Sequence, residues 1–217
     1  MKTVICHFYN EEYMLPWWLK HHKHIFDHGI MIDYNSEDRS REIIKEICPT
    51  WDIHMSENWW FDSINCDQEV MKWERTVEGW RMALNVTEFL YGNTDHLRDD
   101  SGFDQYLIGT YVFIDMQNYL QTQGELPTLS HDRPLHEQRM WGYDEFQNLG
   151  VSRAENMARM NRSIHNYPIE YPPGRHFGNG RPRSFNDLVI FYYGWADASK
   201  PGIDRKMQIQ HKMSEND

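Results

Sequence analysis

The 217-residue chain is long enough to bury a substantial core in one α/β domain and short for two domains. Its hydrophobic fraction of 40% and aromatic fraction of 14% exclude a disordered chain. A formal net charge of -11 excludes a general nucleic-acid binder, because such proteins need a basic surface. The charge is uneven, since residues 151–217 contain 10 Lys and Arg against 7 Asp and Glu. A basic C-terminal third on an acidic body favours a small anionic ligand; chance patterning is the alternative.

The three cysteines, Cys6, Cys48 and Cys66, have no paired spacing. This argues against a disulfide framework and against a cysteine zinc site, and a reducing compartment is the simplest interpretation. No apolar stretch approaches the roughly 20 residues that a membrane span needs. We therefore expect a cytoplasmic protein without a membrane span, or a domain excised from a longer chain.

Strands and helices alternate in the first 55 residues. Residues 3–8 predict a short buried strand, followed by a helix over about 14–26. Residues 30–33 predict a second strand, 39–47 a helix with an apolar face, and 51–55 a third strand. This order is typical of the beginning of a parallel α/β sheet.

The remainder of the chain predicts a helix over 67–79 and a strand over 80–86, with Glu88 just beyond it. Further strands are expected over 107–116 and 188–195. The other expected elements are helices over 151–161 and 204–212 and a Pro- and Gly-rich loop over 167–183. Together the elements predict a single α/β domain over residues 1–217, with a central, mostly parallel mixed sheet flanked by helices.

Polar residues follow the predicted strands, and in a parallel sheet such residues meet at one edge, where ligands bind. These residues are Asn10, Glu11, Asp33, Tyr34, Ser36, Asp38 and Glu88. A strand-end carboxylate such as Asp33 can accept hydrogen bonds from a uracil imide or a ribose hydroxyl. Ser36 and Asp38 have a plainer interpretation as N-caps of the next helix.

A Gly-rich segment over 174–183 contains three arginines and one histidine. Glycines let backbone amides approach phosphate oxygens, and arginine binds phosphate in a two-point manner. We therefore expect Arg175 and Arg181 to contact an anionic ligand. The alternative is a flexible basic surface loop.

The order of these motifs resembles the N-terminal half of family-2-type glycosyltransferases with the GT-A fold. Members have a first strand ending in Asn-Glu and a second ending in D-x-x-S-x-D-x-S; this chain has Asn10-Glu11 and Asp33-x-x-Ser36-x-Asp38-x-Ser40. The resemblance covers residues 3–90. It implies a GT-A-like domain with a nucleotide-binding half over 1–90 and an acceptor- and metal-completing half over 91–217. It also implies that a UDP-sugar donor is bound by Phe8, Tyr9, Asn10, Glu11, Asp33, Tyr34, Ser36, Asp38, Arg175 and Arg181.

The metal motif departs from that family. Members have D-x-D-E-F-L, whose acidic pair binds a divalent ion against the donor diphosphate, and this chain has Asn85-x-Thr87-Glu88-Phe89-Leu90. Asn and Thr oxygens can still ligate Mn²⁺ or Mg²⁺, but weakly. The resemblance thus implies Mn²⁺ or Mg²⁺ held by Asn85, Thr87 or Glu88. His176 is expected to complete the set, and His165 is the second choice. A metal-poor site is the alternative.

The implied activity is transfer of a hexose or deoxyhexose from a UDP-sugar to a glycan or glycoprotein acceptor. An inverting transfer needs a carboxylate base. Asp115, which follows the apolar run 111–114, is the first candidate, with Asp132 and Glu137 in reserve. The alternative is a catalytically inactive nucleotide- or glycan-binding module, favoured by the lost acidic pair. The compact form and altered metal motif also resemble glycosyltransferases encoded by large algal viruses.

Overall fold

The computed structural model describes residues 1–97, 104–114, 128–140, 142–144, 161–176, 178–180, 183–184 and 187–213. The predictions for Asp115, Arg181 and a helix over 151–161 fall outside these residues. No helix in the described ranges is long and apolar enough to cross a membrane.

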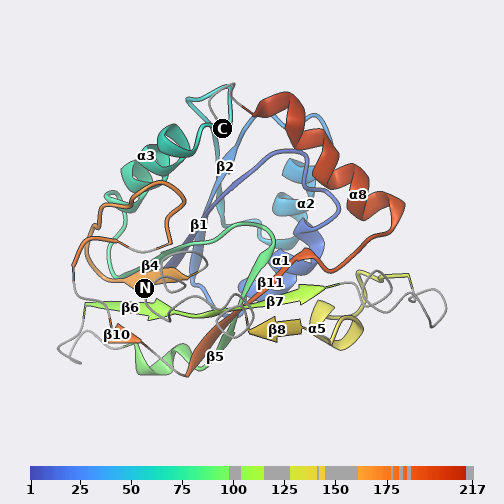
Figure 1. The fold of residues 1–217 in the computed structure, drawn as a ribbon. Helices are drawn as coiled ribbons and strands as arrows, with labels where there is room; N and C mark the ends of the chain where they lie inside the picture. Colours follow the sequence, from blue (N-terminus) through green and yellow to red (C-terminus); the bar gives the residue numbers. More distant parts are fainter. Residues whose placement is uncertain are drawn as a thin grey trace.

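The described elements form two packed sheets with helices around them (Figure 1). The strands are β1 (Lys2–Phe8), β2 (His28–Asp33), β3 (Asp52–Met55), β4 (Trp80–Ala83), β5 (Glu88–Gly92), β6 (Gln105–Ile108), β7 (Thr110–Ile114), β8 (Gly142–Asp144), β9 (Arg162–His165), β10 (Arg183–Ser184) and β11 (Leu188–Trp195). The helices are α1 (Leu15–His22), α2 (Ser40–Ile47), α3 (Ser63–Glu74), α5 (Leu135–Gln138) and α8 (Lys200–Met207), with 3₁₀ turns η1 (Thr94–His96) and η2 (Gln208–Lys212).

The larger sheet has the order β10-β6-β9-β4-β1-β2-β3 in the part of the chain described. Strand β1 pairs in parallel with β2 and β4, β2 pairs in parallel with β3, and β9 runs antiparallel between β4 and β6. Phe8 lies opposite Asp33, and Asp33 lies opposite Met55, so these strands end at the same level. The predicted central, mostly parallel mixed sheet is confirmed.

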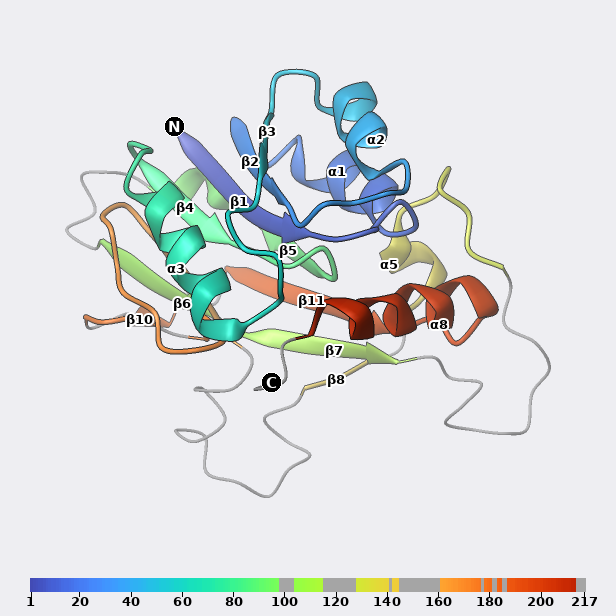
Figure 2. The same ribbon diagram turned by 90° about the horizontal axis from the view of Figure 1, so that it is seen from above.

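Strand β1 is buried on both faces, as its continuous apolar run predicts. Because side chains alternate along a strand, Val4, Cys6 and Phe8 join the core cluster that contains α1 and α2 residues. Ile5 faces the opposite way and joins the cluster that contains Val70 of α3. Figures 1 and 2 show the result: α3 covers one face of β1 and β2, and α1 and α2 cover the other.

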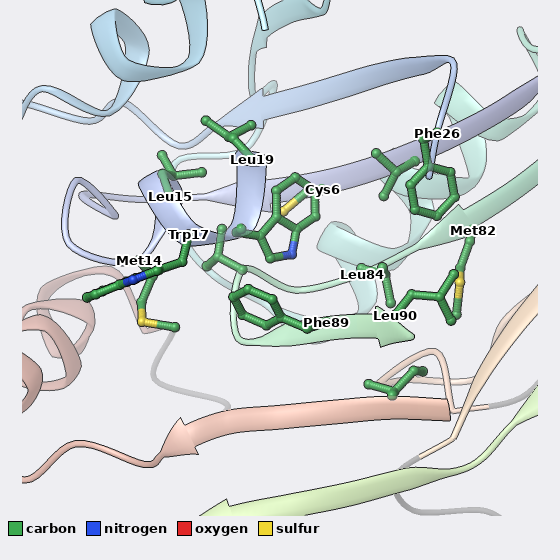
Figure 3. Close-up of a cluster of buried hydrophobic side chains, with 14 of the residues drawn as sticks. Cys6, Met14, Leu15, Trp17, Leu19, Phe26, Met82, Leu84, Phe89 and Leu90 are labelled. Atoms are coloured by element: carbon green, nitrogen blue, oxygen red, sulfur yellow. The ribbon is translucent and has the colours of Figure 1, made fainter. Parts of the chain in front are cut away.

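The larger apolar core fills the space between α1, β1, β4 and β5 (Figure 3). Trp18 of α1 is fully buried, and its indole Nε1 donates a hydrogen bond of 2.9 Å to the backbone oxygen of Glu88. Phe89 and Leu90 of β5 pack into the same cluster. Helix α1 therefore fixes the position of β5, which begins at Glu88.

Two expected elements differ from the structure in the middle of the chain. Strand β4 ends at Ala83, and Glu88 opens β5 instead of following the end of β4; Glu88 N–H donates to the backbone oxygen of Asn85 at 2.9 Å, which closes a turn. The strand expected over 107–116 is two strands, β6 and β7, separated at Gly109. Strand β7 belongs to the smaller sheet, of order β5-β11-β7-β8 among the described strands.

The helix bounds also shift. The helix expected over 67–79 is α3, which begins earlier because the Asp62 carboxylate accepts the N–H of Asn65 at 2.9 Å as an N-cap. The helix expected over 204–212 is α8 followed by the 3₁₀ turn η2. The strand expected over 188–195 is confirmed as β11.

Candidate functional site

A pocket of about 880 Å³ lies at the carboxyl ends of β1 and β4. Its walls come from six regions: the end of β1 with the residues after it, the start of α3, the β4–β5 turn, the start of β9, the loop over 174–176, and the end of β11 with the C-terminal segment after it. Open α/β sheets bind ligands at this edge, and the volume suits a small-molecule ligand. Of the residues predicted to bind the donor, Phe8, Tyr9, Glu11 and Arg175 line this pocket.

The two N-terminal motifs bind each other. The N–H of Asn10 donates to Ser36 Oγ at 2.9 Å, and the Asn10 side-chain oxygen accepts the N–H of Glu37 at 2.8 Å. The N–H of Glu11 donates to Ser40 Oγ at 2.8 Å. Asn10 has a positive φ of 48°, which asparagine tolerates better than most residues. The motifs therefore build a rigid loop pair beside the pocket.

Of the two predicted caps of α2, Asp38 bonds the first helical residue and Ser36 does not. Arg39 occupies the N-cap position and makes no side-chain cap bond. Asp38 instead accepts the N–H of Ser40 at 3.0 Å and that of Glu12 at 2.9 Å, which joins the two loops. Asp38 therefore bonds an N–H of the first helical turn, as expected of a cap, whereas the Ser36 hydroxyl is bound by the N–H of Asn10.

Asp33 and Tyr34 lie behind the pocket wall. The fully buried Asp33 carboxylate accepts the N–H of Ser36 at 2.8 Å and pairs with Arg41 Nε at 2.8 Å. The Tyr34 hydroxyl donates to Cys66 Sγ, and its ring stacks on Phe61. Asn10, Asp33, Tyr34, Ser36 and Asp38 do not line the pocket. Their role in donor binding stays a prediction.

Glu88 forms a buried ion pair with Arg162 of β9. Arg162 Nη2 donates to Glu88 Oε1 at 2.6 Å and Nε donates to Oε2 at 3.0 Å, and both side chains are about 5% exposed. Glu88 Oε2 also accepts the N–H of Asn85 at 2.8 Å. This two-point pair ties the β4–β5 turn to β9 across the pocket.

Arg175 forms a second buried pair, with Asp67 of α3. Its Nη2 donates to Asn85 Oδ1 at 3.0 Å and to His7 Nδ1 at 3.3 Å. Burial, followed by the charges of Arg175 and Arg162, lowers the pKa of His7 well below its ordinary value. His7 is therefore neutral at pH 7 and can accept from Arg175.

His176 is held by the same arrangement. Its Nδ1 accepts from Arg162 Nη1 at 3.1 Å. Burial and then the Arg162 charge lower the pKa of His176 to about 4, so the ring is neutral at pH 7. A Cβ on Gly174 would lie 2.9 Å from this ring, and Gly174 has a φ of +93°, so only glycine suits this position.

The C-terminal helix α8 supplies the remaining cations. Arg205 Nε donates to Glu11 Oε2 at 2.6 Å and Nη2 donates to Oε1 at 3.0 Å. Lys206 also lines the pocket, and its Nζ lies 3.0 Å from the ring centroid of Trp195. Burial, and then the charge of Arg205, lowers the pKa of Lys206 to about 8, while Glu11 opposes this shift.

The pKa of Lys206 predicts how anion binding depends on pH. Below about pH 8 Lys206 carries its charge, and above it the charge is lost. Affinity for inorganic pyrophosphate, measured by calorimetry, should fall about tenfold from pH 7 to pH 9. The fall should be absent in Lys206→Met. An equal fall in both proteins would contradict the assignment.

The residues predicted to hold a metal fit a divalent ion poorly. Both Glu88 oxygens accept from Arg162, Asn85 Oδ1 accepts from Arg175, and His176 Nδ1 accepts from Arg162. Freeing Glu88 would leave a buried guanidinium without its partner, which costs about 3–5 kcal/mol. No three His, Cys, Asp or Glu side chains group as a metal site within the described ranges.

The other two predicted metal ligands, Thr87 and His165, differ in their position relative to the pocket. Thr87 lines the pocket. His165, the second choice to complete a metal site, is fully buried outside the pocket lining, with Nε2 2.9 Å from the Tyr171 hydroxyl and 3.3 Å from Glu74.

The reserve catalytic bases lie away from the pocket. Asp132 and Glu137 are exposed beside or within α5, and Glu137 lies 3.8 Å from Arg133 Nε. Neither lines the pocket. Among the described pocket-lining residues the carboxylates are Glu11, Asp67 and Glu88, and each is paired with an arginine.

Several pocket residues were not predicted from the sequence. The charged and ring-bearing ones that matter most for the chemistry include His7, Asp67, Arg162, Trp195, Arg205 and Lys206. Four of these, Arg162, Trp195, Arg205 and Lys206, lie in the basic C-terminal third. The charge asymmetry was thus the one sequence signal for them.

Comparison with known proteins gives matches among solved structures. No protein-family model matches the chain, and no curated protein matches it significantly. Residues 1–349 of S. aureus TarS superpose with a TM-score of 0.51 at 14% identity, covering 97% of this chain and 64% of that one. A second S. aureus TarS structure gives a TM-score of 0.51 at 14% identity, covering 96% and 38%. TarS 1–349 in complex with UDP-GlcNAc gives 0.49 at 15% identity, covering 97% and 66%.

The chain thus spans less than two thirds of the first TarS structures that it matches. An identity of 14% supports a statement about the fold alone. The mostly parallel sheet, the flanking helices and this likeness agree: the chain has a GT-A glycosyltransferase fold.

Proposed function

We propose that this chain is a glycosyltransferase that binds a UDP-sugar in the pocket at the carboxyl ends of β1 and β4. The observation that carries the proposal is a GT-A fold whose sheet-edge pocket presents Lys206 without a carboxylate bonded to it. Arg162, Arg175 and Arg205 line the same pocket. A nucleoside diphosphate is a small anion of the kind that such cations attract.

Two further observations support a UDP-sugar. S. aureus TarS, whose fold this chain shares, has been crystallised with UDP-GlcNAc and with UDP. Tyr9 and Phe61 both line the pocket, with ring centroids 6.4 Å apart. Their aromatic faces suit a planar base, and Trp195, which is 61% exposed, offers a similar face to a sugar ring.

The finer parts of the proposal rest on the sequence resemblance. They are a hexose or deoxyhexose as the sugar, a glycan or glycoprotein as the acceptor, a cytoplasmic location and an origin among large algal viruses. Asp115 remains the proposed base of an inverting transfer. The resemblance also implies metal assistance, which the buried Glu88–Arg162 pair disfavours.

A catalytically inactive binding module of the same fold is the second candidate. One observation favours it: every carboxylate among the described pocket-lining residues is paired with an arginine. Their oxygens are bonded to guanidinium groups and are not free to take a proton from an acceptor hydroxyl, and a binding module needs no such base.

Calorimetry and a turnover assay test the proposal together. UDP should bind, and GDP should bind at least about tenfold more weakly, a difference of about 1.4 kcal/mol. With a panel of UDP-sugars, the enzyme should release UDP slowly even without an acceptor. Tight GDP binding without UDP binding would reject the donor, and UDP binding without any UDP release in the presence of glycan acceptors would favour the inactive module.

A further inference from the structure

We infer that side-chain cations, with Lys206 as the free charge, hold the donor diphosphate in this pocket without a divalent metal ion. The inference rests on the proposed function for the identity of the donor, and it adds how the donor is held.

The first step is that the pocket's carboxylates are already neutralised. Three ion pairs line it: Glu88 with Arg162, Asp67 with Arg175, and Glu11 with Arg205. Their side chains are 5–11% exposed, so water replaces few of these contacts. A divalent cation needs ionised oxygen ligands at about 2.0–2.6 Å. To supply them, the pocket would have to break a buried two-point pair and place two cations side by side.

The second step is that the pairs are anchored in separate elements. Glu88 opens β5, Arg162 opens β9, Asp67 lies in α3, and Arg175 lies in the loop between β9 and β10. Asn85 connects the first two pairs, because it donates to Glu88 through its N–H and accepts from Arg175 through Oδ1. One side chain cannot turn toward a metal without disturbing this whole network.

The third step is that cationic donors remain for an anion. Lys206 lines the pocket over Trp195, and its partners are the ring and the charges of Arg205 and Glu11. The buried Nε of Arg175 has no hydrogen-bond partner. With the three pairs close to neutral, Lys206 gives the described pocket-lining side chains a net positive charge. A diphosphate can thus bind through Lys206 and the outer hydrogens of the guanidinium groups.

Calorimetry of the whole chain with UDP, once in excess chelator and once in Mn²⁺, tests the inference. The dissociation constants should agree within about fivefold. Binding more than about fivefold tighter in Mn²⁺, with the gain lost in Glu88→Gln, would overturn it. The same gain retained in Glu88→Gln would overturn it as well, because a metal would then act through other groups.

Inorganic pyrophosphate in chelator separates this inference from the proposed function. If pyrophosphate binds and UDP does not, the cation site stands and the UDP donor fails. If neither binds in chelator, the cation site is overturned.

Lys206→Met should weaken pyrophosphate binding about tenfold, or about 1.4 kcal/mol. The matched control is Lys200→Met on the same helix, whose side chain is 83% exposed and outside the pocket lining, and it should bind as the unaltered chain does. Equal binding by all three proteins would overturn the role of Lys206.

Discussion

Replacing Arg162 with methionine should lower the free energy of unfolding by about 3–5 kcal/mol. The Glu88 side chain is 5% exposed, and Arg162 supplies two of its hydrogen bonds. Methionine keeps much of the length of the side chain but leaves a buried carboxylate without its cation. Urea unfolding at pH 7, with midpoints compared at equal slope, measures the loss.

Two controls sharpen this prediction. Arg162→Met combined with Glu88→Gln should recover part of the loss, because both buried charges are then gone. Arg39→Met removes an exposed pair with Glu46, whose side chains are 68% and 62% exposed, and should cost at most about 1 kcal/mol. If Arg162→Met cost no more than Arg39→Met, the Glu88 pair would not be the buried contact described.

Replacing Trp18 with alanine should also cost about 3–5 kcal/mol, because it empties a fully buried site. Trp18 packs against His22 and Trp51, and its Nε1 binds the backbone oxygen of Glu88. The loss should therefore loosen β5 at the point where the pocket begins. Thermal and urea unfolding measure the stability change, and pyrophosphate calorimetry measures the effect on the pocket.

Trp18→Phe separates packing from the hydrogen bond. This variant keeps most of the apolar contact and loses the indole donor. It should lower the free energy of unfolding by about 1–3 kcal/mol, which is less than the loss in Trp18→Ala. Trp59→Ala is the matched surface control, since Trp59 is 57% exposed and should change stability by about 0.5 kcal/mol or less. A Trp18→Ala protein as stable as Trp59→Ala would contradict the described core.

The first half of the fold was predictable because its signals are local. The apolar run at residues 3–8, the polar loop after it and the Ser- and Asp-rich turn near Ser36 mark strand ends and helix starts. Three strands and two helices lie where these signals place them, with ends shifted by up to four residues. Their parallel order follows from the connections.

The second sheet was not predicted, because its signals are weak. Gly109 separates β6 from β7, and a glycine inside an apolar run can mark such a bend. The segment after Ala83 turns and enters another sheet at Glu88, although Leu84 and Val86 favour a strand that continues from β4. This segment joins the second sheet because β5 pairs with β11, which lies about 100 residues later in the chain. No local sequence pattern predicts that pairing.

The pocket was predictable only in part for the same reason. Tyr9, Glu11, Glu88 and Arg175 were expected because each follows a strand or lies in a Gly-rich loop. Their partners come from distant segments, as with Glu11 and Arg205, which are 194 residues apart. From the sequence, the Glu88 carboxylate is a candidate metal ligand. In the folded chain it is paired with the guanidinium group of Arg162.

A crystal of the chain soaked with UDP and Mn²⁺ shows directly which groups hold the diphosphate. We expect the diphosphate in the pocket at the carboxyl ends of β1 and β4, within hydrogen-bond distance of Lys206 Nζ. The Glu88–Arg162 pair should be intact, with no metal ion bound to Glu88. UDP bound elsewhere, no bound UDP at saturating concentration, or Mn²⁺ bridging the diphosphate to Glu88 with Arg162 displaced would contradict it.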